Sequence, residues 1–480
     1  MQIAFAVSEV EDLVKTGGLA DVGKALPVAL SHLGHDVRIV MPLYKSIAQH
    51  ANLSDACSPL TLQYPGGTEG FSVKQLSLHG VTVYLIDAPQ YFMREGLYTD
   101  GYEPYADNGQ RFAFFAQAVL VTLSHLSFIP DILHCNDWHT GIIPSLMRLN
   151  HNPTIAEEFT QTRSILTIHN AAFQGVFSAQ TVPLVAGLEQ VIPVDSGGYV
   201  NFLQSGLSHC DAITSVSPTY AKELLTDLGS HGLSGVLQPR ASRLVGILNG
   251  CDYSQWDPAS DEYIEDHFSL DDMSGKRKCK SKLQKFAKLP RKARVPVVGM
   301  VCRLTTQKGF GYIMPILERL LAHNVQLVIV GTGDPTVVEQ LQHLSQKYSD
   351  KFAFIHGFSN QYAHWIEAGS DFFLMPSEFE PCGLNQMYSL AYGTLPIVRG
   401  VGGLKDTVVD HEANPAHATG FMFLAPQPQA LLDCIRRALL HYHEDPDSFT
   451  ELQQRAMQTR FTWEASAQQY AALYEKLACV

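Results

Sequence analysis

Short apolar runs alternate with helix-like stretches along this chain, and the same alternation starts again in its second half. The apolar runs do not follow a strict apolar–polar alternation, which is typical of strands buried on both faces of a parallel sheet covered by helices. The expected strands of the first half are 3–7, 36–40, 81–86, 132–134, 164–168, 212–216 and 244–247. Those of the second half are 296–302, 326–330, 352–355, 372–375 and 395–397. The pattern predicts an α/β protein with two doubly wound, Rossmann-like domains and a cleft between them.

The expected domain junction lies near Leu248, because the stretch that follows it is rich in turn formers and charge and holds no clear strand. At 480 residues the chain is also longer than one hydrophobic core usually supports. We therefore expect an N-terminal domain over residues 1–248 and a C-terminal domain over residues 249–460. The segment 461–480 is expected to form a last helix that crosses back onto the first domain.

The charge balance and the cysteines limit the possible partners and the compartment. A formal net charge of −13 argues against general binding to nucleic acid or to an anionic membrane. We find no signal peptide and no apolar stretch long enough to span a bilayer. The nine cysteines are scattered without a CxxC pair, which favours reduced thiols and a cytoplasmic protein. The sequence gives no indication of the oligomeric state.

Two distant segments combine glycines with charged side chains where a strand is expected to pass into a helix. They are Lys15-Thr16-Gly17-Gly18-Leu19-Ala20-Asp21, and Phe379-Glu380-Pro381-Cys382-Gly383-Leu384 followed by Gly402-Gly403-Leu404-Lys405-Asp406. The N–H groups at the start of a helix favour an anion, so the two segments together predict a phosphorylated sugar bound in the cleft. For the first segment, which matches neither GxxxxGK[ST] nor GxGxxG, a glycine turn with a solvated lysine is the alternative. The glycine pairs of the two segments also resemble each other, which is a weak sign of related halves.

Polar clusters follow two more of the expected strands. His134-Cys135-Asn136-Asp137-Trp138-His139 holds several potential metal ligands, but no second cluster with zinc-finger spacing accompanies it. We therefore expect no metal there, and we expect Asp137 and His139 to hydrogen-bond sugar hydroxyls or to shape the cleft. Trp138 fits a core position as well as a stacking surface. His169, at another strand end, is expected to contact the reacting sugar, although a lone histidine there is more often structural.

Two cations follow the first strand of the second half. Arg303 and Lys308 are five residues apart, and together they form a clamp suited to a diphosphate. A leaving nucleotide diphosphate gains negative charge as its bond to the sugar breaks, so fixed cations stabilise the transition state more than the ground state. Glu380 is expected to contact the sugar, while the helix that begins at Leu384 faces phosphate. The segment 331–333 fits either a nucleotide contact or an ordinary turn.

Two charged segments are interpreted as parts of the solvent-facing surface. The basic run from Lys276 to Lys282 is expected to form mainly a solvated helix face. Asp445-Pro446-Asp447 has the spacing of a metal-binding DxD motif, but it lies in an acidic, polar connection away from any expected strand end. We therefore expect it to be a loop.

Taken in order along the chain, these motifs resemble those of the bacterial glycogen synthases and plant starch synthases. The resemblance rests on Lys15 to Asp21, Asp137-Trp138-His139, His169-Asn170, Asn249-Gly250, Arg303 with Lys308-Gly309, and Phe379 to Leu384, and it spans almost the whole chain. It implies a GT-B glycosyltransferase. Such an enzyme moves glucose from ADP-glucose to the 4-hydroxyl at the non-reducing end of an α-1,4-glucan such as glycogen, with retention of anomeric configuration.

The resemblance also implies roles for individual residues. The implied catalytic residues are Glu380, His169, Arg303 and Lys308. The implied substrate-binding residues are Lys15, Gly17, Gly18, Asp21, Tyr98, Asp137, His139, Asn170, Asn249, Cys382, Gly383 and Leu384. No cofactor or metal is expected. Tyr388 stands where an E-x7-E pattern would place a second carboxylate, so the resemblance implies a front-face reaction through an oxocarbenium-like state rather than a double displacement.

Two other functions remain open from the sequence. A nucleotide-sugar epimerase of the same architecture would use no glucan, and a non-catalytic protein would only bind glucan or nucleotide. Without the resemblance, the residues do not fix whether the donor carries adenine or uracil.

Overall fold

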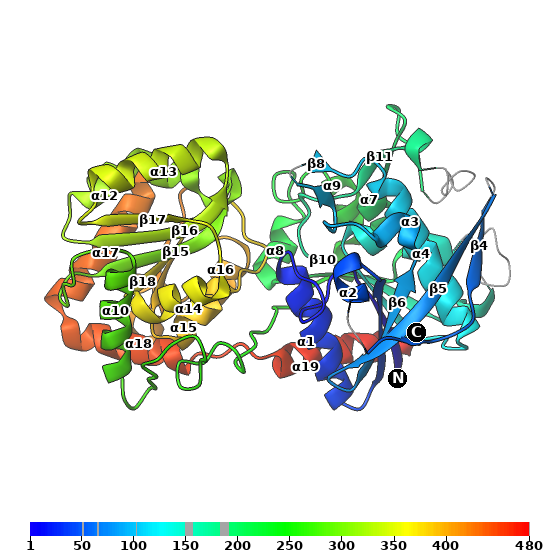
Figure 1. The fold of residues 1–480 in the computed structure, drawn as a ribbon, viewed down its shortest axis with the longest axis horizontal. Helices are drawn as coiled ribbons and strands as arrows, with labels where there is room; N and C mark the ends of the chain where they lie inside the picture. The colour runs from blue at the N-terminus through cyan, green and yellow to red at the C-terminus, as the bar shows by residue number, and fades with distance from the viewer. Residues whose placement is uncertain (50–51, 65–66, 102, 149–156, 183–191, 480) are drawn as a thin grey trace. The chain divides into compact units, whose positions relative to one another are not determined.

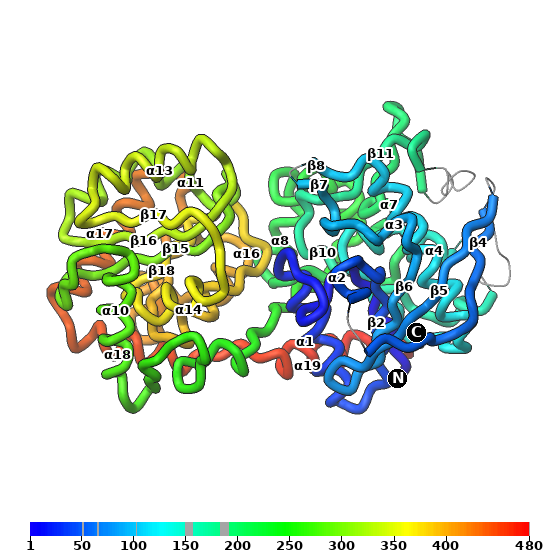
Figure 2. Tube along the Cα trace, in the orientation of Figure 1, coloured from blue at the N-terminus to red at the C-terminus, as the bar shows by residue number. Residues whose placement is uncertain are grey.

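The computed structural model describes residues 1–49, 52–64, 67–101, 103–148, 157–182 and 192–479. Its contacts divide the chain into two compact units, each a sheet covered by helices (Figures 1 and 2). Unit 1 is Met1–Asn249 with Trp463–Val480, and unit 2 is Gly250–Thr462. The sequence analysis places these boundaries at 248/249 and 460/461, within two residues of those that the contacts define.

Unit 1 is built on a sheet in which ten strands are described, in the order β14-β13-β10-β9-β1-β2-β6-β5-β3, with β4 paired to β5. The parallel strands are β1 (Gln2–Ala6), β2 (Asp36–Pro42), β6 (Val81–Asp87), β9 (Ile132–Asn136), β10 (Arg163–Ile168), β13 (Ala212–Ser215) and β14 (Leu244–Gly246). All seven were predicted from the sequence. The antiparallel strands β3 (Ser54–Asp55), β4 (Leu60–Tyr64) and β5 (Gly67–Leu78) were not predicted.

The helices of unit 1 pack around a core that includes the fully buried Phe5, Phe112, Phe114 and Phe115. They are α1 (Gly18–His32), α2 (Lys45–Ala48), α3 (Pro89–Phe92), α4 (Asn108–His125), α5 (Ile143–Arg148), α7 (Phe202–His209), α8 (Pro218–Glu223), α9 (Ser234–Leu237) and α19 (Trp463–Ala478). Two small antiparallel sheets each consist of two short strands. One pairs β7 (Thr99–Asp100) with β8 (Glu103–Pro104), and the other pairs β11 (Val176–Ser178) with β12 (Tyr199–Asn201). The C-terminal helix α19 packs against α1, and its Tyr474 hydroxyl lies 2.6 Å from Nδ1 of the buried His134.

Unit 2 has a fully parallel sheet in the order β17-β16-β15-β18-β19-β20. The strands are β15 (Val297–Leu304), β16 (Gln326–Gly333), β17 (Phe352–His356), β18 (Phe372–Met375), β19 (Leu395–Arg399) and β20 (Phe421–Phe423). The helices are α10 (Ser274–Phe286), α11 (Phe310–Ile313), α12 (Leu317–Leu321), α13 (Pro335–Lys347), α14 (Asn360–Gly369), α15 (Asn385–Ala391), α16 (Gly402–Thr407), α17 (Pro428–Glu444) and α18 (Pro446–Gln458).

The sheet of unit 2 separates two apolar cores. In β16, Leu327 and Ile329 belong to one core, and Val328 and Val330 belong to the other. Both views show α13 on one side of strands β15 to β17 and α14 on the other (Figures 1 and 2). Because both faces are covered, every residue of such a strand can be apolar, which is why the sequence shows continuous runs.

Two interpretations from the sequence need correction in unit 2. The basic run lies on α10, and Arg277, Lys278 and Lys282 are exposed as expected, but Lys276 and Lys280 are only 6% and 7% exposed, because α10 packs against α14 and both ammonium groups find partners inside unit 2. The segment Asp445-Pro446-Asp447 is not a loop, because Pro446 and Asp447 lie in the first turn of α18 and Asp445 is the single residue between α17 and α18. The side chain of Asp445 accepts a hydrogen bond of 3.1 Å from the backbone N–H of Ser448 and so caps α18, with Pro446 as the first helical residue.

Candidate active site

In unit 1 the predicted residues gather at the carboxyl ends of β1, β9 and β10, which are neighbours in the sheet. Glu9 and the glycine segment come after β1, Asp137 follows β9, and His169 follows β10. Parallel strands end at the same edge of the sheet, so residues from three distant parts of the sequence share one edge. This is the edge at which doubly wound sheets bind ligands.

Glu9 holds the glycine segment in place. Its carboxylate, only 3% exposed, accepts hydrogen bonds from the backbone N–H of Thr16 at 2.5 Å and from the Thr16 hydroxyl at 2.6 Å. The Tyr98 hydroxyl donates to the same carboxylate at 2.7 Å, and it lies 2.8 Å from Oγ of Ser8. Glu9 was not predicted from the sequence. The available signal was a carboxylate placed between the first strand and the glycine segment.

Lys15 keeps its positive charge while it remains partly open to solvent. Its Nζ lies 2.7 Å from Oδ1 of Asp21 and 2.8 Å from Oε1 of Glu11, and its side chain is 43% exposed. Burial alone would lower the pKa of Lys15, but the two carboxylates raise it above its ordinary value. Burial raises the pKa of Asp21 to about 6 in spite of the neighbouring ammonium. Gly17 caps α1 nearby, and a Cβ built there would meet nothing within 4 Å.

Asp137 and Asn136 fix the position and tautomer of His169. Oδ1 of Asp137 accepts the backbone N–H of His169 at 2.8 Å, and burial raises the pKa of this carboxyl to about 7. The Asn136 amide donates to the carbonyl of Ala6, so its Oδ1 is the acceptor for Nε2–H of His169 at 2.9 Å. Burial lowers the pKa of His169 to about 3. The imidazole is therefore neutral near pH 7, with its Nδ1 lone pair available to accept a hydrogen bond. This role of Asn136 was not predicted from the sequence.

Two predicted residues of unit 1 carry buried polar atoms with no hydrogen-bond partner among the described residues: Nδ1 of His139 and Oδ1 of Asn249. The His139 ring lies 4.0 Å from that of Trp138 and 4.7 Å from that of Tyr98, and burial lowers its pKa well below the ordinary value. Trp138 itself is buried and fits the core position that the sequence left open. Asn170 uses its Oδ1 to accept the backbone N–H of Ala172 at 3.0 Å.

In unit 2, Glu380 and Lys308 form an ion pair at the carboxyl ends of β18 and β15. Nζ of Lys308 lies 2.7 Å from Oε2 of Glu380, which also accepts the Ser377 hydroxyl at 2.9 Å. Glu380 is buried, and Lys308 is half-buried on the short 3₁₀ helix Thr306–Lys308. Arg303, near the end of β15, is exposed to solvent. The predicted carboxylate and cations therefore share one edge of the unit 2 sheet.

The second glycine pair supports the segment that carries Glu380. A Cβ on Gly402 would lie 1.9 Å from the carbonyl oxygen of Glu380, and one on Gly403 would lie 2.1 Å from that of Cys382. The backbone N–H of Gly403 donates to the Glu380 carbonyl at 3.1 Å. Gly383 adopts a positive φ of 74°, after which Leu384 caps α15. The first N–H groups of a helix have no partners within it, so this turn can face an anion.

Tyr388 is part of a packed stack. Its ring lies parallel to that of Trp256 at 3.9 Å, and Trp256 stacks in turn on His364 at 3.7 Å. The position where an E-x7-E pattern would carry its second carboxylate is thus filled by a buried aromatic side chain.

Within the described ranges, no group of three or more His, Cys, Asp or Glu side chains is placed to hold a metal ion. In the cluster at the end of β9, both ring nitrogens of His134 are already engaged, with Tyr474 and with Thr167 at 2.6 Å each. In the same part of the chain, no helix is long and apolar enough to cross a membrane.

Comparison with known proteins decides the family. The model of the starch synthase catalytic domain matches residues 2–239, and that of glycosyl transferases group 1 matches residues 281–456. The glycogen synthase of Aeromonas salmonicida (strain A449) is 52% identical over 99% of this chain and 98% of its own length. This chain belongs to the glycogen and starch synthase family. The glycogen synthase of Vibrio cholerae (strain O395) is 48% identical over 98% of this chain and 97% of its own length.

A solved member of the glycogen and starch synthase family has the same fold. The catalytic domain of starch synthase IV from Arabidopsis thaliana, bound to ADP and acarbose, matches with a TM-score of 0.91 at 31% identity. The match covers 100% of this chain and 99% of that one. Together with the seven parallel strands of the unit 1 sheet and the parallel sheet of unit 2, it confirms the predicted GT-B fold with two Rossmann-like domains.

Proposed function

We propose that this chain transfers glucose from ADP-glucose to the 4-hydroxyl at the non-reducing end of an α-1,4-glucan, with retention of configuration, and so elongates glycogen. The relatives named glycogen synthase match it along nearly its whole length, and the starch synthase neighbour holds ADP and acarbose. The observation that carries the proposal for this chain's own residues is the Lys308–Glu380 ion pair at the carboxyl edge of the unit 2 sheet.

The cations of unit 2 would promote departure of the nucleotide diphosphate. Lys308 uses one of its three N–H donors on Glu380, which leaves two for phosphate oxygens, and the exposed Arg303 can add a bidentate contact. Since negative charge grows on the diphosphate as the bond to glucose breaks, these contacts strengthen in the transition state. We propose on this basis that the reaction uses no metal and no cofactor.

Glu380, with the backbone of Cys382, Gly383 and Leu384, would hold the glucose. We propose that departure and attack occur on the same face, and that the leaving phosphate takes the acceptor proton. His169 suits this step because its neutral ring adds no positive charge beside an oxocarbenium-like sugar, and its Nδ1 can accept a hydrogen bond from a sugar hydroxyl.

In unit 1, Lys15 would supply a cation to the donor beside the Gly17-Gly18 turn, with Asp21 and Tyr98 holding that segment in shape. His139, Asn170 and Asn249 would contact the sugar or the acceptor; His139 and Asn249 each keep a buried polar atom unsatisfied. We place the reaction in the cytoplasm. None of the nine cysteines forms a disulfide bond in the part of the chain that the structure describes.

The direct test is to incubate the protein with ADP-glucose, with and without glycogen, and to measure ADP release. Release that requires glycogen supports transfer. An epimerase would convert the sugar nucleotide equally well without glucan, and a binding protein would release no ADP in either case. A competition between ADP-glucose and UDP-glucose with a glucan primer then decides the base, and we expect ADP-glucose to be used preferentially.

A further inference from the structure

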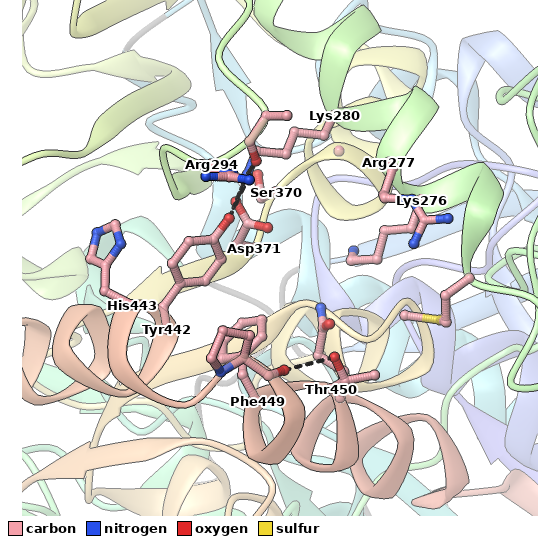
Figure 3. Close-up of a pocket in the computed structure, with 15 residues that line it drawn as sticks. Lys276, Arg277, Lys280, Arg294, Ser370, Asp371, Tyr442, His443, Phe449 and Thr450 are labelled. Carbon is pink, nitrogen blue, oxygen red and sulfur yellow. Dashed lines mark hydrogen bonds and ion pairs between the residues drawn. The ribbon is translucent and has the colours of Figure 1, made fainter.

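A cavity of about 560 Å³ lies at the edge of the unit 2 sheet opposite the one that carries Glu380. Asp371, which precedes β18, lines it, and its Oδ2 accepts the backbone N–H of Val297, the first residue of β15. Figure 3 shows α10 above the cavity and α17 and α18 below it. The volume falls within the range typical of small-molecule sites.

The cavity is strongly cationic in an acidic chain. Four cationic side chains line it: Lys276, Arg277, Lys280 and Arg294. Among the described lining residues, Asp371 alone carries a carboxylate. Nζ of Lys280 lies 2.7 Å from Oδ2 of Asp371, so these two charges offset each other. Three positive charges remain without a lining carboxylate, in a protein whose formal net charge is −13.

Lys276 is a buried ammonium held by neutral groups. Its Nζ donates to the hydroxyl of Thr394 at 2.6 Å and to the carbonyl of Ala368 at 3.2 Å. Burial lowers its pKa to about 8. Burial outweighs the attraction of the nearby Asp371, which is itself paired with Lys280, so an anion in the cavity would add a counter-charge and stabilise Lys276.

The two arginines stand at the mouth. Arg277 and Arg294 are exposed, and neither makes a hydrogen bond or ion pair with another described residue. Guanidinium groups bind phosphate and carboxylate oxygens alike in bidentate geometry, but the cluster of positive charges favours a doubly charged phosphate over a singly charged carboxylate.

One wall of the cavity is aromatic. Tyr442 of α17 lies beside the cations with its hydroxyl 3.0 Å from Nζ of Lys280, and Phe449 of α18 lies below it (Figure 3). A flat apolar ring can pack on this wall, whereas the acidic chain as a whole disfavours a polyanion such as nucleic acid.

We propose that this cavity binds a small phosphate monoester that carries a planar ring, at a site separate from the active site. The phosphate contacts Lys276, Arg277 and Arg294, and the ring packs on Tyr442. The site lies at the amino ends of β15 and β18, whereas Arg303 and Glu380 lie at or beyond their carboxyl ends, so both can be occupied together.

The test is calorimetric titration of the full chain with phenyl phosphate, in saturating ADP so that nucleotide occupies any donor site. Inorganic phosphate and phenol serve as probes of the two halves of the ligand. We expect phenyl phosphate to bind more tightly than inorganic phosphate and phenol not to bind. The double variant Arg277→Ala with Arg294→Ala should weaken phenyl phosphate by about tenfold or more.

The matched control replaces two exposed cations outside the cavity, Lys285→Ala with Arg291→Ala, and should leave the affinity within about twofold. A second variant, Thr450→Glu, adds a carboxylate at the mouth and should also weaken binding. The proposal is overturned if the wild-type chain fails to bind phenyl phosphate, or if the arginine variant binds as the control does. Binding is measured without glucan, so the result does not depend on transfer activity.

Discussion

Gly17-Gly18 in unit 1 and Gly402-Gly403 in unit 2 begin nearly the same sequence, yet their surroundings differ. Gly17 has an extended backbone (φ −166°), and a Cβ there would meet nothing within 4 Å. Gly402 has a φ of +43°, and a Cβ on it would lie 1.9 Å from the carbonyl oxygen of Glu380. In unit 2 the chain itself requires glycine, because two backbone segments touch. In unit 1 the space beside Gly17 is not filled by the chain, and it is open to a ligand.

The largest effect is expected for Gly402→Ala. A Cβ would strain a left-handed backbone and collide with a carbonyl group, so we expect a loss of about 3–5 kcal/mol in the free energy of unfolding. Urea denaturation measures it. A loss below about 1 kcal/mol would show that the two segments separate easily and would remove the contrast with unit 1.

The buried carboxylates of the two units differ as well: Glu380 faces an ammonium, whereas Asp137 accepts backbone N–H groups from His169 and Asn170. The pKa of Asp137 is about 7 in the folded chain and about 3.8 when unfolded, so the folded state binds its proton more tightly. The contribution of Asp137 to the free energy of unfolding is fully favourable below pH 3.8 and is lost as the pH rises through 7. This contribution is at most about 4 kcal/mol.

The asparagine of the Asp137→Asn variant cannot ionise, so the variant should lose less unfolding free energy than the wild type between pH 5 and pH 8 (about 1–3 kcal/mol less). Urea denaturation of the wild type and the variant at pH 5 and pH 8 measures this difference. It isolates the effect of the Asp137 carboxyl, because every other titratable group is present in both proteins. Parallel pH dependences would contradict a raised pKa for Asp137.

Glu380→Ala should lower kcat by about 100-fold while the KM for ADP-glucose changes by less than about threefold, because its contact matters most in the transition state. Glu378→Ala is the matched control and should retain most of the activity. Comparable kinetics for the two variants would remove Glu380 from the site.

Lys15→Ala should raise the KM for ADP-glucose by about tenfold, since one ammonium contact to the donor is lost. Its half-exposed ion pairs contribute little to folding, so the thermal midpoint should change by only a few degrees. Unchanged kinetics would show that Lys15 does not contact the donor.

The smallest effect on folding is expected for Gly17→Ala, at about 0.5 kcal/mol or less, because the added methyl has room. If a donor approaches this backbone, the same variant weakens donor use without unfolding the protein. Paired with Gly402→Ala, it gives the sharpest comparison of the two glycine segments.

Most of the strands that the sequence revealed are buried on both faces, although the partly exposed β14 was also predicted and the short β20 was not. In β5, by contrast, exposed and half-buried residues such as Glu69 and Lys74 interrupt the apolar pattern, because one face is open and the pairing is antiparallel. That strand was missed for a physical reason: its stability comes from neighbours, not from a continuous apolar run.

The motifs of the candidate site could be found from short segments of the sequence. The side chains that hold these motifs in place could not, because they act through residues distant in the sequence. Glu9 accepts a hydrogen bond from Tyr98, which lies 89 residues away in the sequence. Lys280 forms an ion pair with Asp371, which lies 91 residues away. Nothing local distinguishes such side chains from solvated ones. The burial of Lys276 likewise depends on Ala368 and Thr394, which only the tertiary fold brings close.

The linkage that the protein makes is the most direct test of the proposed transfer. Glycogen incubated with the protein and ADP-glucose labelled in the sugar is digested with β-amylase, which removes maltose from the non-reducing ends of α-1,4-glucans. We predict that the glycogen becomes labelled and that the label is released as maltose. Label that resists this digestion, or glycogen that stays unlabelled while ADP-glucose is consumed, would contradict the proposed transfer.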